Sequence, residues 1–409
     1  MDNIAGSPVE GENFYAREAD VERLSEILSN DDILLLGARR IGKTSIARAV
    51  MVNVRESGWR TVEINVASCQ DERDFLDKME SKLRPELASP GAKAAGTISD
   101  AWDAIGSRIK SIKVSISGTG VDIGLGSGIA EDWTHIANDV LRLLMDTEHR
   151  WLIYIDELPI FLFNVIRRDP HNGVQRVRRF LDWFRNDVRA LPGTRKVRWL
   201  VSGSVGLDTL VQQHGMADTI NSMKHESLEA FKDDVAIGML CKLATRYGLA
   251  LTEADARKIV DAVLWAQPYY LQLAFHHVRS AIAAAGSIDM SALAAQAIEK
   301  MAQPSEDNDF HHWEGRLSIQ LSTTDAAHCL ALLELAAEQP NGARAETLLA
   351  RLQERMPNAP QEEARRAFFV LRDILQRDAY WWPDESEGHK RYRFRLEPLR
   401  RWWLRRNSL

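Results

Sequence analysis

The sequence predicts an α/β domain with a mostly parallel β-sheet, followed by an all-helical domain and a C-terminal winged helix-turn-helix domain. Three observations indicate this order. Between residues 33 and 201, short apolar or alternating segments, typical of strands, alternate with segments that have the apolar spacing of helices. After about residue 223 the strand patterns stop, and helical patterns follow one another. In the last part of the chain, three helical segments precede a pair of β-rich segments.

Length and composition agree with several cores in one globular chain. The 409 residues exceed the usual size of one domain, and 45% hydrophobic with 27% charged residues is typical of soluble proteins. No apolar run is long enough to span a membrane, and the N-terminus is acidic where a secretory signal would be basic. We therefore expect a cytoplasmic protein with no membrane segment. The cysteines lie far apart and predict buried thiols rather than disulfides or a zinc site: Cys69, Cys241 and Cys329.

The first of three expected domains covers residues 1–222. Its strands alternate with helices, which favours a parallel sheet. The segment Trp151 to Ile155 is apolar throughout, and this suits a strand covered on both faces. A Gly- and Ser-rich region with alternating stretches at 109–116 and 121–125 predicts an inserted β-hairpin. The predicted strands are 33–36, 60–66, 151–155 and 197–201, and the predicted helices are 13–28, 44–56, 72–83, 132–147 and 175–190.

The second and third expected domains cover residues 223–305 and 306–409. A polar segment, 304–309, is the predicted linker between them. The helical domain is predicted to contain helices 228–247, 252–266, 268–285 and 290–301. In the last domain, the predicted helices are 325–338, 344–355 and 361–377, the predicted strands are 379–382 and 392–394, and the loop 383–390 is the expected wing.

A loop between the first predicted strand and the next helix carries the strongest motif. The segment GARRIGKT, from Gly37 to Thr44, fits the pattern G-x-x-x-x-G-K-[ST]. Glycines let backbone N–H groups turn toward phosphate oxygens, Lys43 reaches the β- and γ-phosphates, and the Thr44 hydroxyl is a ligand for Mg²⁺. A chance match in a chain of this length has a probability of about 1%. We therefore predict a phosphate-binding loop for a nucleoside triphosphate with Mg²⁺.

Two carboxylates, Asp156 and Glu157, directly follow the apolar strand 151–155. An Asp at the end of a neighbouring strand can hold Mg²⁺, and a second carboxylate beside it can orient or deprotonate the attacking water. This is the Walker B pattern. A strand that ends in two acids is common by itself, so the assignment depends on the phosphate-binding loop upstream. Glu157 is the predicted catalytic base, and it indicates hydrolysis rather than binding alone.

Two further positions are candidates for contacts with the nucleotide. Ser204, or else Ser202, follows the strand 197–201 and is a candidate sensor of the γ-phosphate or of water. A serine that caps a turn is the alternative. Arg17 and Glu18 lie in the helix before the first strand, and they either border the nucleotide base or form an exposed ion pair.

Several segments together resemble the archaeal-type ATPases, a family that belongs with the STAND and origin-recognition-like branches of the AAA+ superfamily. The segments are FYARE at 14–18, GARRIGKTS at 37–45, WLIYIDELP at 151–159, VSGS at 201–204 and AQPYYLQLA at 266–274. The closing YRFRLEPLRRWW is similar to the end of that family's winged-helix domain. The resemblance spans almost the whole chain, and its most specific motifs are the two Walker sites.

The resemblance implies ATP as the nucleotide, held with Mg²⁺ between a P-loop domain of the AAA+/ASCE type and a helical lid. The family's lid commonly carries a Gly-x-Pro whose proline packs near the adenine. Here Ala266-Gln267-Pro268 keeps the proline and lacks the glycine. No arginine finger is assigned from the sequence. The helix 175–190 offers candidates, but a solvated helix face is the preferred interpretation for them: Arg176, Arg178, Arg179 and Arg185. The implied nucleotide-binding loop residues are Gly37, Ala38, Arg39, Arg40, Ile41, Gly42, Lys43, Thr44 and Ser45.

Three functions agree with these motifs. The first is an ATPase switch that passes its nucleotide state to a protein partner or to a homo-oligomer, the second is a DNA-associated ATPase that grips duplex with its winged helix, and the third is a nucleotide-binding regulator with little turnover. The eight basic residues from Lys390 to Arg406, against one acid, favour DNA. Acids in the candidate recognition helix 361–376 and in the wing would repel phosphate. The switch is therefore the preferred interpretation.

Overall fold

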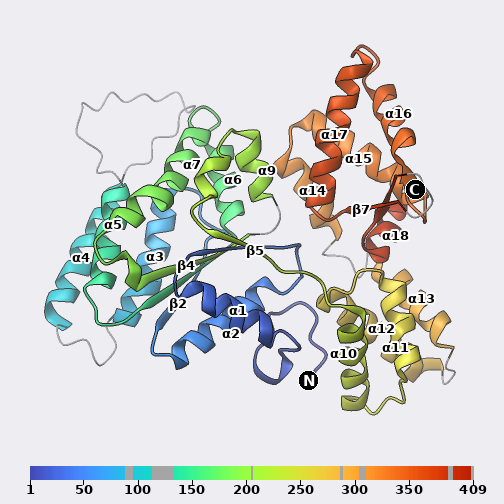
Figure 1. Cartoon of the computed structure of the whole chain (residues 1–409), viewed down its shortest axis with the longest axis horizontal. Coiled ribbons are helices and arrows are strands. Elements are labelled where there is room, and N and C mark those ends of the chain that lie inside the picture. Colours follow the sequence, from blue (N-terminus) through green and yellow to red (C-terminus); the bar gives the residue numbers. More distant parts are fainter. Residues whose placement is uncertain are drawn as a thin grey trace. The chain divides into compact units, whose positions relative to one another are not determined.

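A five-stranded parallel β-sheet forms the centre of the N-terminal half of the chain (Figure 1). The computed structural model describes residues 1–87, 95–112, 133–203, 206–285, 289–303, 310–385 and 390–406. These residues divide into two compact units. We call residues Arg17–Gly37 and Lys43–Leu228 the sheet unit, and residues Met1–Ala16, Ala38–Gly42 and Glu229–Leu409 the helical unit.

The sheet has the strand order β2-β3-β4-β1-β5, and every neighbouring pair of strands is parallel. Its strands are β1 (Ile33–Leu36), β2 (Arg60–Asn65), β3 (Trp151–Asp156), β4 (Val197–Ser202) and β5 (Lys224–Ser227). The helices of this unit are α1 (Glu18–Leu28), α2 (Lys43–Glu56), α3 (Glu72–Leu87), α4 (Ala95–Ser111), α5 (Trp133–Met145), α6 (Leu158–Arg168), α7 (Gly173–Asp182), α8 (Val188–Ala190) and α9 (Leu207–Gln213). A π-helical turn, Trp183–Asp187, joins α7 to α8.

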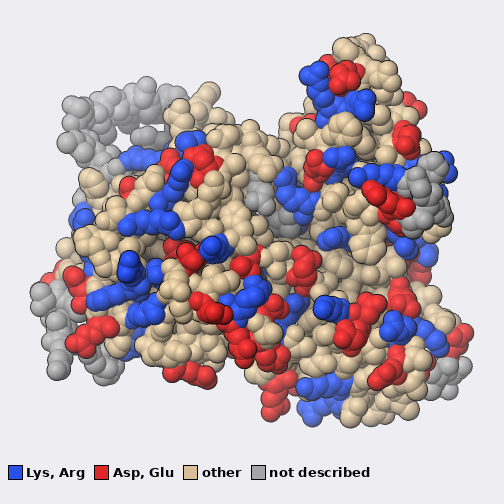
Figure 2. Space-filling model, in the orientation of Figure 1, with Lys and Arg blue, Asp and Glu red and all other residues tan. Residues whose placement is uncertain are grey.

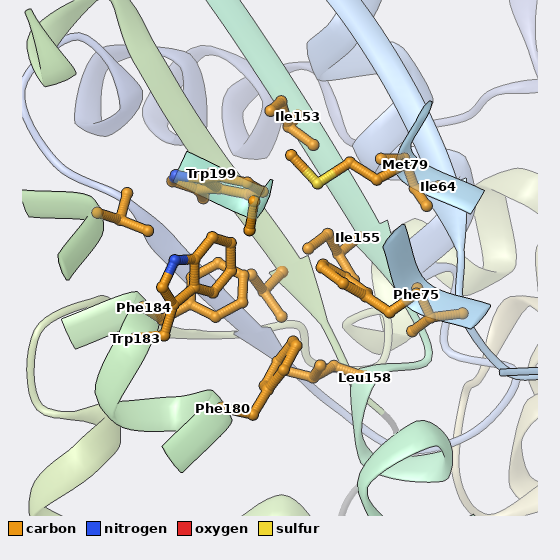
Figure 3. Packing of buried hydrophobic residues seen from close by; sticks show 14 of the residues in the cluster. Ile64, Phe75, Met79, Ile153, Ile155, Leu158, Phe180, Trp183, Phe184 and Trp199 are labelled. Atoms are coloured by element: carbon orange, nitrogen blue, oxygen red, sulfur yellow. The ribbon is translucent and has the colours of Figure 1, made fainter. Parts of the chain in front are cut away.

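Both faces of the sheet are covered, which explains the continuous apolar pattern of its central strands. Alternate side chains of a strand point to opposite faces. Ile153, Ile155 and Trp199 point into a large core that includes side chains of α3, α5 and α7 (Figure 3). The opposite face is covered by α1 and α2 (Figure 1). Leu152 and Tyr154, the alternate residues of β3, are fully buried there.

The predicted α/β fold class is confirmed, but β5 of the parallel sheet and the short β6 (Ala343–Arg344) of the C-terminal sheet were not predicted. We expected strand patterns to stop at about residue 223, whereas β5 covers Lys224–Ser227 and pairs with β1. This strand lies at the edge of the sheet, and its sequence KHES is polar and largely exposed. Its position is determined by backbone hydrogen bonds to β1, which leave no hydrophobic pattern in the sequence.

Two other predicted elements differ from the structure. The predicted helix 13–28 begins only at Glu18, because residues 11–13 form a separate 3₁₀ turn and Ala16 has a positive φ of 52°. The predicted β-hairpin falls mainly outside the described residues. Its first residues, 109–111, form the end of helix α4 instead, where Ile109 is buried. The alternation that suggested a strand there is also compatible with one buried residue per helical turn.

The helical unit begins with four helices that follow the predicted order. A capping box starts α11, because Thr252 and Asp255 satisfy each other's backbone N–H groups. The helices and strands of this unit are α10 (Asp233–Arg246), α11 (Glu253–Val263), α12 (Pro268–Ala285), α13 (Met290–Met301), α14 (Phe310–Gln320), α15 (Thr323–Glu338), β6 (Ala343–Arg344), α16 (Ala345–Arg355), α17 (Gln361–Arg377), β7 (Trp381–Asp384), β8 (Arg391–Phe394) and α18 (Glu397–Arg405).

The last part of this unit has the element order of a winged helix-turn-helix. Helices α15, α16 and α17 precede an antiparallel sheet of order β6-β8-β7. Aromatic side chains form its core, and Trp381, Tyr392 and Trp403 are buried in it. The Tyr380 hydroxyl donates a hydrogen bond to the carbonyl of Trp313 in α14, a helix that the sequence pattern did not predict. The division of the chain into three domains remains a prediction.

The three thiols differ in burial. Cys69 and Cys329 are buried as predicted, whereas Cys241 is only partly buried. Burial raises the pKa of the Cys69 thiol to about 11, and the nearby carboxylate of Asp74 adds to the shift. No helix in the described part of the chain has both the length and the apolar character needed to span a lipid bilayer.

Candidate functional site

The carboxyl ends of β3 and β4 place Tyr154, Asp156 and Ser202 on one face of the sheet. Because side chains alternate along a strand, Asp156 shares the face of Tyr154, and Ser202 shares the face of Leu200. This face is also where helix α2 begins after the phosphate-binding loop. Asp156 is buried, with 6% of its surface exposed.

Asp156 accepts hydrogen bonds from two hydroxyl groups that come from different elements. The Ser202 Oγ donates to Oδ1 of Asp156 at 2.6 Å. The Thr44 Oγ1, in the first turn of α2, donates to Oδ2 at 3.2 Å. The two predicted metal ligands, Thr44 and Asp156, are therefore in direct contact. A carboxylate and a hydroxyl supply the oxygen atoms that Mg²⁺ prefers.

Tyr154 extends this network below the carboxylate. Its hydroxyl lies 3.1 Å from the Ser202 Oγ. Since the Ser202 proton is directed at Asp156, the Tyr154 hydroxyl is the donor in this bond. Burial raises the pKa of Tyr154 well above its ordinary value, and the negative charge of Asp156 raises it further. The phenol therefore remains protonated and holds Ser202 in the orientation that serves Asp156.

Lys43 is directed back toward the start of the phosphate-binding loop. Its Nζ donates a hydrogen bond to the carbonyl of Gly37 at 2.9 Å. Lys43 is buried, with only 7% of its surface exposed. Gly37 and Gly42 have φ values of 152° and 104°, which L side chains rarely adopt. The loop thus has the backbone conformation for which the motif requires glycine.

Residues 38–42 of the loop belong to the helical unit. Arg40 has a positive φ of 65°. Its guanidinium donates to the carbonyl of Gly6 at 3.0 Å and lies 4.6 Å from the ring centroid of Tyr269, in the first turn of α12. Ala38 and Ile41 are buried. The predicted nucleotide contacts of these loop residues remain predictions.

Glu157 occupies an unusual position between β3 and α6. Its backbone is in the left-handed region, with φ 62° and ψ 38°, which costs free energy for a residue other than glycine. Its Oε2 atom is buried and has no hydrogen-bond partner among the described residues. The next helix is held close to β4, because a Cβ on Gly203 would lie 2.6 Å from Cγ of Pro159. The carboxylate therefore has an unused acceptor beside Asp156.

The other predicted site residues have different outcomes. Ser204 lies outside the described residues, whereas the alternative, Ser202, contacts Asp156 directly. Arg17, the residue before α1, pairs with Asp20 at 3.1 Å. Ser45 is buried in α2, and Pro268 is the first residue of α12. The nucleotide-binding roles of Arg17, Ser45 and Pro268 remain predictions.

Asn65 is a polar neighbour of Asp156 that the sequence reasoning missed. It ends β2 and is in register with Asp156 of β3. Its Nδ2 lies 3.5 Å from Oδ2 of Asp156, and its Oδ1 accepts a hydrogen bond from the N–H of Ala67. A polar residue at the carboxyl end of the strand next to β3 was a usable signal, but it depends on knowing that β2 and β3 are neighbours.

Two solved structures are similar to this chain over almost its full length. The Walker-type ATPase of Pyrococcus abyssi is 16% identical, with a TM-score of 0.62, and the match covers 99% of this chain and 100% of that protein. The ORC2 protein of Aeropyrum pernix, solved in ADPNP–ADP complexes, is also 16% identical, with a TM-score of 0.55, and the match covers 95% of this chain and 92% of that protein. The chain therefore shares the fold of these two proteins. No protein-family model matches the sequence, and the search of curated proteins gives no match.

Three of the four predicted arginine-finger candidates form ion pairs within the sheet unit. Arg176 is largely buried and pairs with Glu72 and Asp169, so it does not lie on a solvated helix face. Arg178 and Arg185 both pair with Asp218, at 3.3 and 2.6 Å. These ion pairs explain the arginine-rich sequence of α7 by contacts within the unit.

Within the ranges that the structure describes, the site offers only two candidate protein ligands for a metal ion, Thr44 and Asp156. The described residues contain no group of three or more His, Cys, Asp or Glu side chains arranged to hold a metal ion. Thr44 and Asp156 provide one hydroxyl and one carboxylate. This small set fits Mg²⁺, which is usually bound by one or two protein oxygens together with substrate phosphates.

Proposed function

We propose that this protein binds ATP with Mg²⁺ at the phosphate-binding loop and hydrolyses it. The observation that carries the proposal is the contact of Thr44 with Asp156, beside a second carboxylate, Glu157, that has an unused buried acceptor. A motif match alone indicates binding. The approach of the loop hydroxyl to the Walker B carboxylate supports a site that holds a metal ion and a triphosphate together.

Each residue has a separate role in this proposal. Lys43 neutralises charge on the β- and γ-phosphates, and backbone N–H groups of the loop hold the phosphate oxygens. Thr44 and Asp156 hold Mg²⁺, which supplies electrostatic stabilisation of the phosphates when bound. Glu157 accepts a proton from the attacking water or orients that water. Ser202 keeps Asp156 in position, as its 2.6 Å hydrogen bond suggests.

The biological output is proposed to be a nucleotide-dependent switch that acts on a protein partner or on self-assembly. Support comes from the fold shared with the Walker-type ATPase of Pyrococcus abyssi and from the ADPNP–ADP complexes of the Aeropyrum pernix ORC2 protein. Helix α12 contacts Arg40 of the phosphate-binding loop within the helical unit. That contact offers a route by which nucleotide in the loop affects the helices.

Steady-state phosphate release in the presence of Mg²⁺ tests hydrolysis. We expect Lys43→Ala to abolish ATP binding in calorimetry. We expect Glu157→Gln to keep binding and to lower turnover by about 10²- to 10⁴-fold, the usual contribution of a general base. Unchanged hydrolysis in Glu157→Gln would reject the assignment of the base. Binding without turnover in the native chain would favour a nucleotide-binding regulator instead.

Duplex DNA is the alternative partner, and the structure supplies an observation against it. Arginines that made the C-terminal tail look cationic are engaged within the helical unit. Arg400 pairs with Glu397 and donates a hydrogen bond to the Ala337 carbonyl. Arg405 pairs with Glu299. Arg406 pairs with Glu334. Around α17 and α18, basic and acidic side chains are interspersed on the face shown in Figure 2. Paired arginines have less charge available for phosphate contacts.

Binding to labelled duplex at several salt concentrations distinguishes the two partners. A DNA-associated ATPase would lose affinity linearly with the logarithm of the salt concentration. We expect no such salt-dependent binding by the native chain. A steep linear loss of affinity would show that the partner is duplex DNA and not a protein. The proposal of ATP hydrolysis would be unaffected.

A further inference from the structure

Helix α17 has an exposed stripe that contains two large apolar side chains. Phe369 and Val370 keep 40% and 59% of their surface exposed, while the other side of the helix is buried in the unit. Arg365 and Arg366 lie one turn earlier and are also exposed. The Arg365 guanidinium is 5.7 Å from the Phe369 ring centroid. We call Arg365, Arg366, Phe369 and Val370 the α17 ridge.

A groove of about 580 Å³ lies elsewhere in the same unit, between α15, α16 and α18. We call it the α15–α18 groove. Its apolar lining comes from Leu335, Trp403 and Leu404, and its acidic lining comes from Glu334, Glu338 and Glu354. Leu404 is 38% exposed. The groove therefore combines an apolar surface with carboxylates.

The ridge and the groove are complementary in charge and in polarity. Within the described part of the chain, neither Arg365 of the ridge nor Glu338 of the groove has an ion-pair partner. By contrast, Glu354 of the groove pairs with Arg351 at 3.3 Å, and Glu334 pairs with Arg406 at 2.7 Å. Contiguous exposed apolar surface with a polar rim is a mark of interaction sites.

We propose that the α17 ridge of one copy of this chain docks in the α15–α18 groove of a second copy. Phe369 and Val370 fill the apolar part of the groove, and Arg365 pairs with Glu338 of the second copy. The ridge and the groove share no residue, so the contact is heterologous, and each copy in an assembly offers one free ridge and one free groove. The proposal goes beyond ATP hydrolysis and does not depend on it.

The charges of the ridge favour a protein surface over nucleic acid as its occupant. Glu362 and Glu363 precede the two arginines on the same helix, and Asp373 follows them. Acidic and basic side chains are therefore interspersed along the helix, which does not present the uniformly positive surface that suits a phosphate backbone. A partner that presents both carboxylates and apolar carbons suits this mixed helix, and the groove of an identical chain presents both.

Sedimentation velocity of the full chain without nucleotide, over a range of protein concentrations, tests the proposal. We expect reversible association of the native chain. Phe369→Asp in the ridge and Glu338→Arg in the groove should each raise the dissociation constant by at least about tenfold, because each places a charge where the contact needs its opposite or an apolar group. Val52→Asp is the matched control, since Val52 is an apolar residue of α2 with 51% exposure, and it should associate like the native chain.

Mixing the two defective variants tests the heterologous geometry. Phe369→Asp keeps an intact groove, and Glu338→Arg keeps an intact ridge, so an equimolar mixture should form a dimer and no larger species. The double variant Arg365→Glu with Glu338→Arg should recover association, because the ion pair is reversed and not removed. Circular dichroism and phosphate release of each variant check that the fold and the proposed ATP site are unaffected.

Three outcomes would overturn the proposal. The first is a native chain that stays monomeric at every concentration. The second is association that Phe369→Asp does not weaken, or a mixture of the two variants that stays monomeric. The third is binding of a labelled DNA duplex that Phe369→Asp and Arg365→Glu weaken while the native chain is monomeric, which would assign the ridge to nucleic acid.

Discussion

The Thr44 hydroxyl donates a hydrogen bond to Asp156 at 3.2 Å and joins residues that are 112 positions apart in the chain. It connects the first turn of the helix after the phosphate-binding loop with the end of β3. The two motifs were identified separately in the sequence, and this contact is the reason to treat them as one site.

Thr44→Val should lower Mg²⁺-dependent phosphate release, whereas Thr44→Ser should retain most of it. Valine has nearly the shape of threonine but lacks the oxygen that we assign to the metal, and serine keeps that oxygen. We expect about a hundredfold loss for valine, the scale of losing one preorganised polar group in an active site. The measurement is phosphate release as a function of Mg²⁺ concentration. Equal activity of the two variants would remove Thr44 from the metal site.

Ser202→Ala should raise the Mg²⁺ concentration for half-maximal hydrolysis by about 10- to 100-fold. This is the usual loss of metal affinity when a group that orients a metal ligand is removed. The reason is the 2.6 Å hydrogen bond from Ser202 to Oδ1 of Asp156. Tyr154→Phe should have a smaller effect, because it removes only the hydroxyl that hydrogen-bonds to Ser202 and leaves the bond from Ser202 to Asp156 in place. If Ser202→Ala changes the melting temperature but not the Mg²⁺ concentration for half-maximal activity, its role is structural.

Glu157→Gly should be more stable than Glu157→Ala, although both lose turnover. Residue 157 has a φ of 62°, a conformation that costs a non-glycine residue about 1–2 kcal/mol and costs glycine almost nothing. Thermal or denaturant unfolding of the two variants measures the difference. A glycine variant no more stable than the alanine variant would show that the left-handed conformation is not maintained in solution.

Gly203→Ala should destabilise the sheet unit by about 1–3 kcal/mol, the usual cost of overpacking. The added Cβ would lie 2.6 Å from Cγ and 2.8 Å from Cδ of Pro159, and the proline ring cannot rotate away. Gly315→Ala in helix α14 is the control, because a Cβ there meets no atom within 4 Å. That variant should be slightly more stable, since alanine favours helices. Urea unfolding of both variants tests the pair.

Alkylation of Cys69 should be slow at pH 8 in the folded chain and should accelerate as the pH approaches 11. Burial raises its pKa from 9.0 to about 11, so the reactive thiolate is scarce below that range. Because the folded pKa is above the unfolded value, the corresponding stability is complete below pH 9 and is lost as the pH rises through 11. Mass spectrometry after timed iodoacetamide treatment measures the rate. Rapid labelling of native Cys69 at pH 8 would contradict its burial.

Most of the fold was predictable because its main elements carry local signals. The central strands are apolar throughout, since helices cover both faces of the sheet, and the phosphate-binding loop is a contiguous motif. Strand β5 was missed because an exposed edge strand has no hydrophobic pattern. The charge of the C-terminal tail was misleading in a similar way: Arg405 and Arg406 look cationic in sequence but pair with Glu299, Glu314 and Glu334, which are far away in the chain.

By itself, the sequence determined the fold class, the phosphate-binding loop and the two acids after β3, because each depends on residues adjacent in the chain or repeated with a fixed period. Tertiary structure alone decided that Ser202 contacts Asp156, that Asn65 lies beside it, and that Arg405 and Arg406 are paired. The physical reason is that these contacts follow from strand order and helix packing, so residues separated by tens of positions become neighbours only when the sheet is assembled.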